Sequence, residues 1–129
     1  MTKWEQFEME EKIIEVLSMA ELYNDHHFKR SFLTPYQIAI ELIREYPDIC
    51  KELEMELGGK GTGLHYSLTQ YIARTLSARI ENQEIQNVEG AFISTLDLSD
   101  MVFRNSDGQE ICSSKGDNNT LSMFRIKQS

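Results

Sequence analysis

A change in sequence pattern near Asn82 sets the strongest limit on how this chain can fold. Before Asn82, apolar residues recur at the three- and four-residue spacing of amphipathic helices. After it, short runs rich in β-branched and aromatic residues alternate with turn-forming Asn, Asp, Gly and Ser, which is typical of hairpins and meanders. The pattern predicts an α+β fold, with about four helices followed by a small antiparallel β-sheet.

Two helices are expected in the first part of the chain. Residues 4–23 carry apolar side chains at helical spacing among good helix formers. Thr34 and Pro35 predict the start of the second helix, because the Thr hydroxyl can cap a free amide and Pro suits the first helical position. Pro47 predicts its end, since Pro disfavours helical backbone for the residue before it.

Two further helices are expected before the strands. A short helix after Pro47 would turn Ile49 and Leu53 inward. The glycine-rich run 58–63 must be irregular, and we expect an exposed connection there. A longer helix is predicted over residues 67–82, where apolar residues again repeat at helical spacing.

Length and composition favour one domain over residues 1–129. It would comprise an N-terminal helix and connector (1–33), a helical core (34–82) and a β-rich part (83–129). The two cysteines are far apart and have neither metal-binding nor disulfide spacing, so we expect free thiols in a reducing compartment. The charged N-terminus and the lack of a long apolar run predict a cytoplasmic protein that does not enter a membrane.

Charge is unevenly distributed along the chain. The net charge is −8, yet residues 57–80 hold no acidic side chain and three basic ones, Lys60, Arg74 and Arg79. Such a loop and helix suit an anionic partner, whereas the overall acidity disfavours a general nucleic-acid binder. Arg79 points about 140° around the helix from Arg74, so we assign it to the helix C-terminus and not to the same site.

The order helix, helix, short helix, loop, helix, hairpin resembles that of winged helix-turn-helix domains over about residues 34–126. The glycine-rich connection is longer than the usual turn of that superfamily, and the chain is acidic where such proteins are usually basic. The resemblance implies that the helix at 67–82 is the recognition helix, that 101–113 is the wing, and that the outer helix face meets the major groove of duplex DNA. The residues that would contact DNA or another partner are Lys60, Tyr66, Ser67, Thr69, Gln70 and Arg74.

Motifs for catalysis and cofactor binding are weak. The run GGKGTG departs from a P-loop because Lys60 is followed by Gly instead of Ser or Thr. His26, His27 and His65 are candidates for metal binding or base catalysis, but no further ligands stand at a recognised spacing. Cys50 lies among apolar and acidic neighbours that would raise the pKa of its thiol. We therefore expect no enzyme, no catalytic residues, no metal and no cofactor.

Two functions stay open at this stage. The first is a small regulatory or accessory DNA-binding protein of winged-helix type, dimeric through its N-terminal helix, where Trp4 and Phe7 could form an exposed patch. The alternative is a non-enzymatic acidic protein-binding module or inhibitor that occupies the nucleic-acid site of a basic partner, as small phage anti-defence proteins do. Phe92 and Phe124 fall on apolar positions of predicted strands and are assigned to the core.

Overall fold

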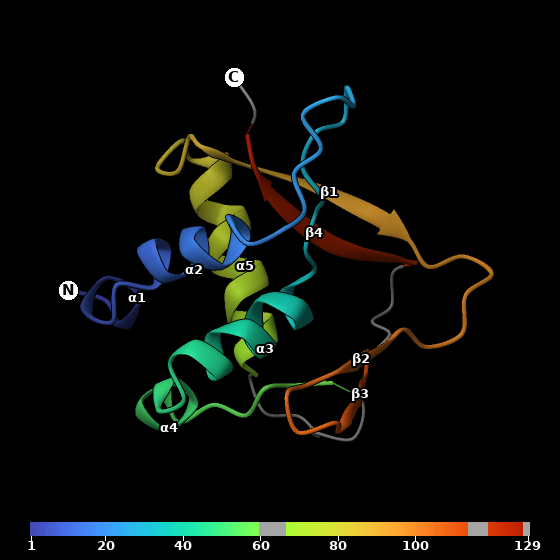
Figure 1. Ribbon diagram of the computed structural model, residues 1–129. Helices are drawn as coiled ribbons and strands as arrows, with labels where there is room; N and C mark the ends of the chain where they lie inside the picture. Colours follow the sequence, from blue (N-terminus) through green and yellow to red (C-terminus); the bar gives the residue numbers. More distant parts are fainter. Residues whose placement is uncertain (60–66, 114–118, 128–129) are drawn as a thin grey trace.

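The computed structural model describes residues 1–59, 67–113 and 119–127 and has an α+β fold (Figure 1). The helices in these residues are α1 (Lys3–Gln6), α2 (Met9–Leu17), α3 (Pro35–Glu45), α4 (Ile49–Leu53) and α5 (Leu68–Glu81). The strands that follow are β1 (Val88–Ser94), β2 (Val102–Arg104), β3 (Glu110–Cys112) and β4 (Thr120–Ile126). The predicted order, a helical part and then antiparallel strands, is confirmed.

The two longest helices begin at reciprocal caps. The Thr34 hydroxyl accepts the Gln37 amide at 3.3 Å, and the Gln37 side-chain oxygen accepts the Thr34 amide at 2.8 Å. Ser67 and Gln70 form the same pair at the start of α5. Each box satisfies amides that have no partner within the first helical turn. Both helix starts agree with the sequence prediction.

The N-terminal helix is broken, which corrects the single helix predicted over residues 4–23. Glu8 lies between α1 and α2 with a left-handed φ of 52°, and α2 ends at Leu17. The chain then continues as a connector to α3, in which Leu22 and Arg30 form an isolated bridge. Apolar residues at helical spacing therefore continue in the sequence beyond Leu17, where α2 ends.

The break turns Trp4 into the core. Its ring is buried, and it meets the Tyr71 ring edge-on with centroids 5.5 Å apart. Phe7 is half-buried and packs against the same core cluster. The exposed patch predicted from Trp4 and Phe7 is therefore wrong, and it gives no basis for a dimer through this helix.

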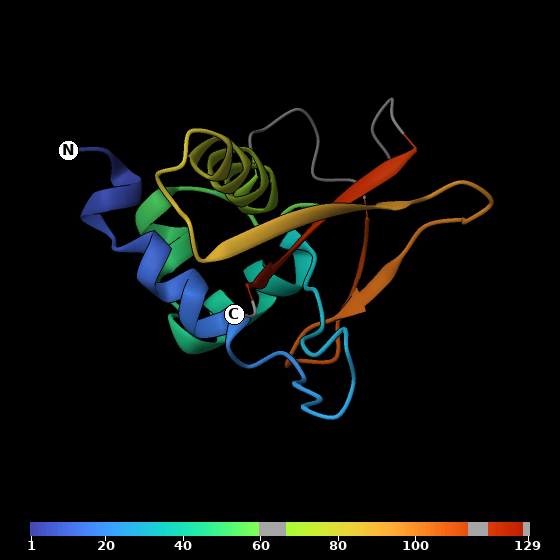
Figure 2. The same cartoon turned by 90° about the horizontal axis from the view of Figure 1, so that it is seen from above.

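The core lies between the helices and one end of the β1–β4 ribbon. Val88 of β1 and Phe124 of β4 join side chains from all five helices of the described chain in one buried cluster. Figure 2 shows the helices gathered at one end of this ribbon, with the other end extending beyond them. No helix in the described ranges is both long and apolar enough to cross a membrane.

The described strands form two separate two-stranded antiparallel sheets. β1 pairs with β4 from Val88 opposite Ile126 to Ser94 opposite Thr120. The β2–β3 hairpin, predicted as the wing, lies between these strands in sequence and forms the second sheet. Its Phe103 ring stacks on Tyr36 of α3 with centroids 5.1 Å apart.

Candidate partner-binding surfaces

The predicted DNA-binding face of α5 is only partly available. Lys60 and Tyr66 lie outside the described residues. Ser67 and Thr69 are buried, which corrects their placement on the outer face of the helix, whereas Gln70 is exposed, as predicted. The face is therefore smaller than the sequence indicated.

Residues 56–58 cover the hydroxyls at the start of α5. The Thr69 amide donates to the Leu57 carbonyl at 3.0 Å, and the Thr69 hydroxyl donates to the same oxygen. Gly58 has a φ of +116°, and a Cβ there would lie 2.7 Å from the Ser67 hydroxyl oxygen. Only glycine permits this approach. Gly58 is buried, which corrects the exposed connection predicted for it, and residues 60–63 of that connection lie outside the described chain.

Arg74 and Arg79 do not form one basic site. Arg79 is partly buried, with its guanidinium 3.9 Å from Glu5, 3.6 Å from Glu84 and 5.8 Å from the Trp4 ring centroid. Its position in the last turn of α5 agrees with its assignment to the helix C-terminus. Arg74 is exposed on a different turn. A basic face made by Arg74 and Arg79 together is absent.

The connector between α2 and α3 borders an open cleft of about 1110 Å³ that is rich in aromatic and cationic side chains. Arg125 holds this connector on β4. Its Nε donates to Glu89 at 2.7 Å, and its Nη1 donates to the Phe28 and Arg30 carbonyls, each at 2.9 Å. Its guanidinium also lies 4.3 Å from the Phe32 ring centroid. These contacts give Arg125 a structural role.

The histidines of the connector contact each other and not a metal-binding group. The His26 and His27 rings stack with centroids 4.6 Å apart, and His26 Nδ1 accepts the Phe28 amide at 3.1 Å. No cluster of three or more His, Cys, Asp or Glu with metal-binding geometry occurs in the part of the chain that the structure describes. His65 lies outside it.

The Cys50 thiol has the pKa direction expected from the sequence. Burial raises its pKa above the usual value for a cysteine. A raised pKa lowers the fraction of thiolate, which is the reactive form of the side chain. The environment of Cys50 thus disfavours a nucleophilic role.

The sequence did not indicate the surface at the far end of the β1–β4 ribbon. We define the distal arm as residues 92–102, the end of β1 and its connection to β2. It exposes large apolar side chains, with exposed fractions of 70% for Phe92, 64% for Leu96, 44% for Leu98 and 53% for Val102. The assignment of Phe92 to the core is therefore wrong. Its strand pattern was correct, but the helices do not reach it.

Three hydrogen bonds support the backbone at the start of the distal arm. The Leu98 amide donates to the Thr95 carbonyl at 3.0 Å, which closes a turn. The Leu96 amide donates to the Ser94 hydroxyl at 3.2 Å, and the Thr95 amide donates to the Asn119 carbonyl at 2.7 Å. The turn spans Thr95 to Leu98. Its residues present Leu96 and Leu98 on an ordered backbone.

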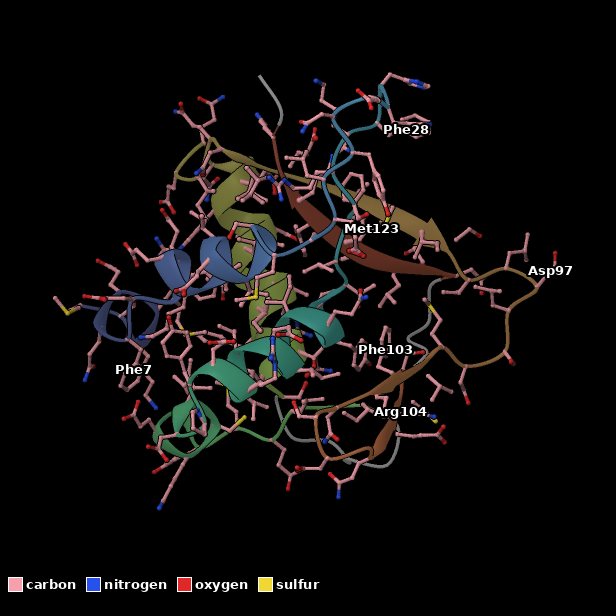
Figure 3. The ribbon with its side chains drawn as sticks, in the orientation of Figure 1. Phe7, Phe28, Asp97, Phe103, Arg104 and Met123 are labelled. Atoms are coloured by element: carbon pink, nitrogen blue, oxygen red, sulfur yellow. The ribbon has the colours of Figure 1, made fainter. Side chains whose placement is uncertain are left out.

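The arm is also fixed where it enters β2. Met101 and Ser113 exchange two hydrogen bonds: the Met101 amide donates to the Ser113 hydroxyl at 3.1 Å, and the Ser113 amide donates to the Met101 carbonyl at 2.8 Å. Figure 3 shows Asp97 at the tip of the arm, on the side away from the helices. The arm thus projects as a bounded, ordered element.

Acidic residues outnumber basic ones in and near the arm. From the start of β1 to just past β3, residues 88–113 contain five acidic side chains, two of them in the arm (Asp97 and Asp100), and one basic one, Arg104. Their net charge is −4, half of the charge of the whole chain. Apolar side chains on an acidic element complement a partner surface that combines apolar contacts with basic residues.

Comparison with known proteins finds no counterpart. No family model, no curated protein and no solved structure matches this chain. The functional proposals that follow therefore depend on the contacts, exposure and charge of this molecule alone.

Proposed function

We propose that the protein is a non-enzymatic protein-binding module that binds a basic partner through the distal arm. The observation that carries the proposal is the exposure of Phe92, Leu96, Leu98 and Val102 on an ordered, acidic element. Scattered apolar residues are normal on protein surfaces, but four large ones exposed on one projecting element favour an interaction site.

The energetics favour such a use of the arm. Full burial of one Leu or Phe side chain contributes about 1.5–3 kcal/mol. Because hydrogen bonds already fix the backbone around Leu96, binding would not have to order this turn, and less of the contact energy would be lost as entropy. The net charge of −8 would also speed the encounter with a basic protein and slow it as salt is added.

A capture experiment tests this proposal. The wild-type protein and a Leu96→Ser/Leu98→Ser variant are immobilised, and the proteins each retains from a cell lysate are quantified by mass spectrometry. We expect a basic protein that the variant retains at least about tenfold less, because two apolar contacts are lost. Cross-linking through a photoreactive residue at Val102 should join the same protein to the arm.

The matched control removes two apolar side chains elsewhere. Met19 and Leu22 are exposed to 46% and 41%, and they lie outside the arm. The Met19→Ser/Leu22→Ser variant should retain the partner as the wild type does. Equal retention by all three proteins would contradict a role for the distal arm.

A second candidate function is sequence-specific DNA binding by α5. Gln70 and Arg74 are both exposed and stand four residues apart, so they share one helix face. Gln can pair with adenine and Arg with guanine, which supports direct base readout. The proposed role is that of a regulatory protein of winged-helix type.

Binding to duplex DNA, measured across salt concentrations, tests this second function. Affinity should fall as salt rises, and Arg74→Ala should weaken binding to a cognate sequence by about 1–3 kcal/mol. Arg104→Ala, at an exposed arginine of β2, is the matched control. A lack of salt-sensitive affinity for any duplex would exclude this candidate.

A further inference from the structure

The two outer edges of the β1–β4 ribbon differ. On the β4 side, Leu33 and Phe124 exchange two backbone hydrogen bonds of 2.8 Å each, and Arg125 holds the connector beside the strand. On the β1 side, no strand or bridge pairs with the outer edge in the part of the chain that the structure describes. One edge is thus covered, and the other is free.

The hydrogen bonds at the ends of the ribbon show which residues of β1 face this free edge. The Thr95 amide donates to Asn119 at 2.7 Å, and the Lys127 amide donates to Asn87 at 2.9 Å. In an antiparallel ladder, every second pair exchanges hydrogen bonds. Ala91 and its partner Met123 are therefore among the pairs that exchange hydrogen bonds between β1 and β4. These pairs alternate with pairs that exchange none.

Phe124 confirms this alternation independently. It stands opposite Gly90, and its amide and carbonyl bond to Leu33, away from β1. By the same alternation, Gly90, Phe92 and Ser94 direct their N–H and C=O groups away from β4, toward the free edge. All three residues are exposed.

The free edge has little protection against pairing. Natural edge strands are usually protected by Pro, by Lys or by an unpaired inward charge. The sequence VEGAFIS of β1 contains neither Pro nor Lys, and its single charge, Glu89, is paired with Arg125 at 2.7 Å. Such an edge can accept an extended peptide as an additional strand.

The negative charge of this chain indicates which kind of segment would bind at the free edge of β1. A second copy of this chain would place one arm, which has two acidic and no basic residues, beside another of the same charge, which is repulsive. A segment that carries Lys or Arg would instead be attracted, and Phe92 would give it an aromatic cross-strand contact. The observations thus favour a basic partner over self-association.

We infer that the free edge of β1, from Gly90 to Ser94, binds an extended basic segment of a partner protein as an additional β-strand. The inference rests on the proposed protein-binding function and specifies how the partner is held. Backbone hydrogen bonds from Gly90, Phe92 and Ser94 give affinity, while the apolar and acidic side chains of the arm give selectivity.

Amide hydrogen exchange, followed by NMR, tests the inference with a synthetic peptide of alternating lysine and valine. In the free protein, the Ala91 and Ile93 amides should exchange slowly because they bond to β4, whereas those of Gly90, Phe92 and Ser94 should exchange fast. The peptide should slow these last three amides by at least about tenfold. A peptide of alternating glutamate and valine is the charge control and should have no such effect.

Other outcomes overturn the inference. If millimolar lysine–valine peptide leaves the three amides unchanged, the edge is not a strand-binding site. If the amides become protected as the concentration of the protein alone rises, the occupant is a second copy. If both peptides protect them equally, charge does not select the partner.

Variants at Phe92 separate the free edge from the side chains of the arm. Phe92→Thr keeps the edge amide and a strand-forming side chain, whereas Phe92→Pro removes the amide without removing a β1–β4 hydrogen bond. Only the Pro variant should abolish protection of Gly90 and Ser94 by the peptide, with thermal unfolding checking that both variants fold. If both variants bind equally while Leu96→Ser/Leu98→Ser still loses the captured partner, the protein-binding function stands and the strand-addition mode fails.

Discussion

Both ends of the β1–β4 ribbon carry apolar side chains, but in opposite environments. Val88 and Phe92 lie on the same face of β1, yet Val88 is fully buried and Phe92 is 70% exposed. Phe124, opposite Gly90, is 2% exposed. The difference arises because the helices pack on one end of the ribbon only (Figure 2). An apolar side chain contributes to stability at the covered end and is available for binding at the projecting end.

The largest effect should come from truncation at the covered end. Phe124→Ala removes a buried aromatic ring, and we expect it to lower the free energy of unfolding by about 3–5 kcal/mol. Phe92→Ala, the matched control at the projecting end, should change it by no more than about 0.5 kcal/mol. Urea denaturation measures both values. Similar losses for the two variants would contradict the proposed difference in burial between the two ends of the ribbon.

A smaller effect on stability is expected at Gly90, which stands opposite the buried Phe124. A Cβ on Gly90 would lie 3.2 Å from the Phe124 ring, which is buried and has little room to move. Gly90→Ala should therefore lower the free energy of unfolding by about 1–3 kcal/mol, as overpacking does. The same substitution in a Phe124→Leu background should cost less, since the ring is absent. An equal cost in both backgrounds would show that the ring contact is not the cause.

The smallest effect on stability is expected from a pH-dependent hydrogen bond between α2 and the end of α3. The Tyr46 hydroxyl donates to the Glu15 carboxylate at 2.6 Å and so joins the end of α3 to α2. This hydrogen bond raises the pKa of Tyr46 above its ordinary value of 10.0. Because the protonated phenol is favoured in the folded state, its contribution is complete below about pH 10 and is lost as pH rises through the raised pKa.

Thermal denaturation between about pH 8 and about pH 11 measures this dependence. The wild type should lose its stability advantage over Tyr46→Phe as the phenol ionises. A Tyr23→Phe variant is the control, since Tyr23 is exposed and no such bond involves its hydroxyl in the described chain. A constant difference between wild type and Tyr46→Phe across this range would contradict the assignment.

Local signals in the sequence predicted the starts of the long helices and the first strand well. Thr34 and Ser67 begin α3 and α5 because each hydroxyl caps an amide only three residues away. Pro47 ends the region of α3 through its steric effect on the preceding residue. The run VEGAFIS forms β1 over its full length. Each of these features depends on neighbours in sequence, so the sequence alone sufficed.

The sequence was less informative about the candidate sites. Ser67 and Thr69 had helical positions compatible with an outer face, but residues 56–58 fold back over them. Trp4 fitted a continuous amphipathic helix, yet the left-handed Glu8 directs it into the core. In the first case, a segment outside the predicted helix covers part of its surface. In the second, a break within the predicted helix turns a side chain inward.

By itself, the sequence determined the α+β order, the caps, the strand runs and the acidic balance, since these follow from short-range backbone chemistry and from counting charges. Only the tertiary structure decided that β1 pairs with the distant β4, and that one end of this ribbon is covered while Phe92 projects beyond the helices. The physical reason is that burial depends on what packs against a surface, and packing partners distant in the chain leave no local pattern.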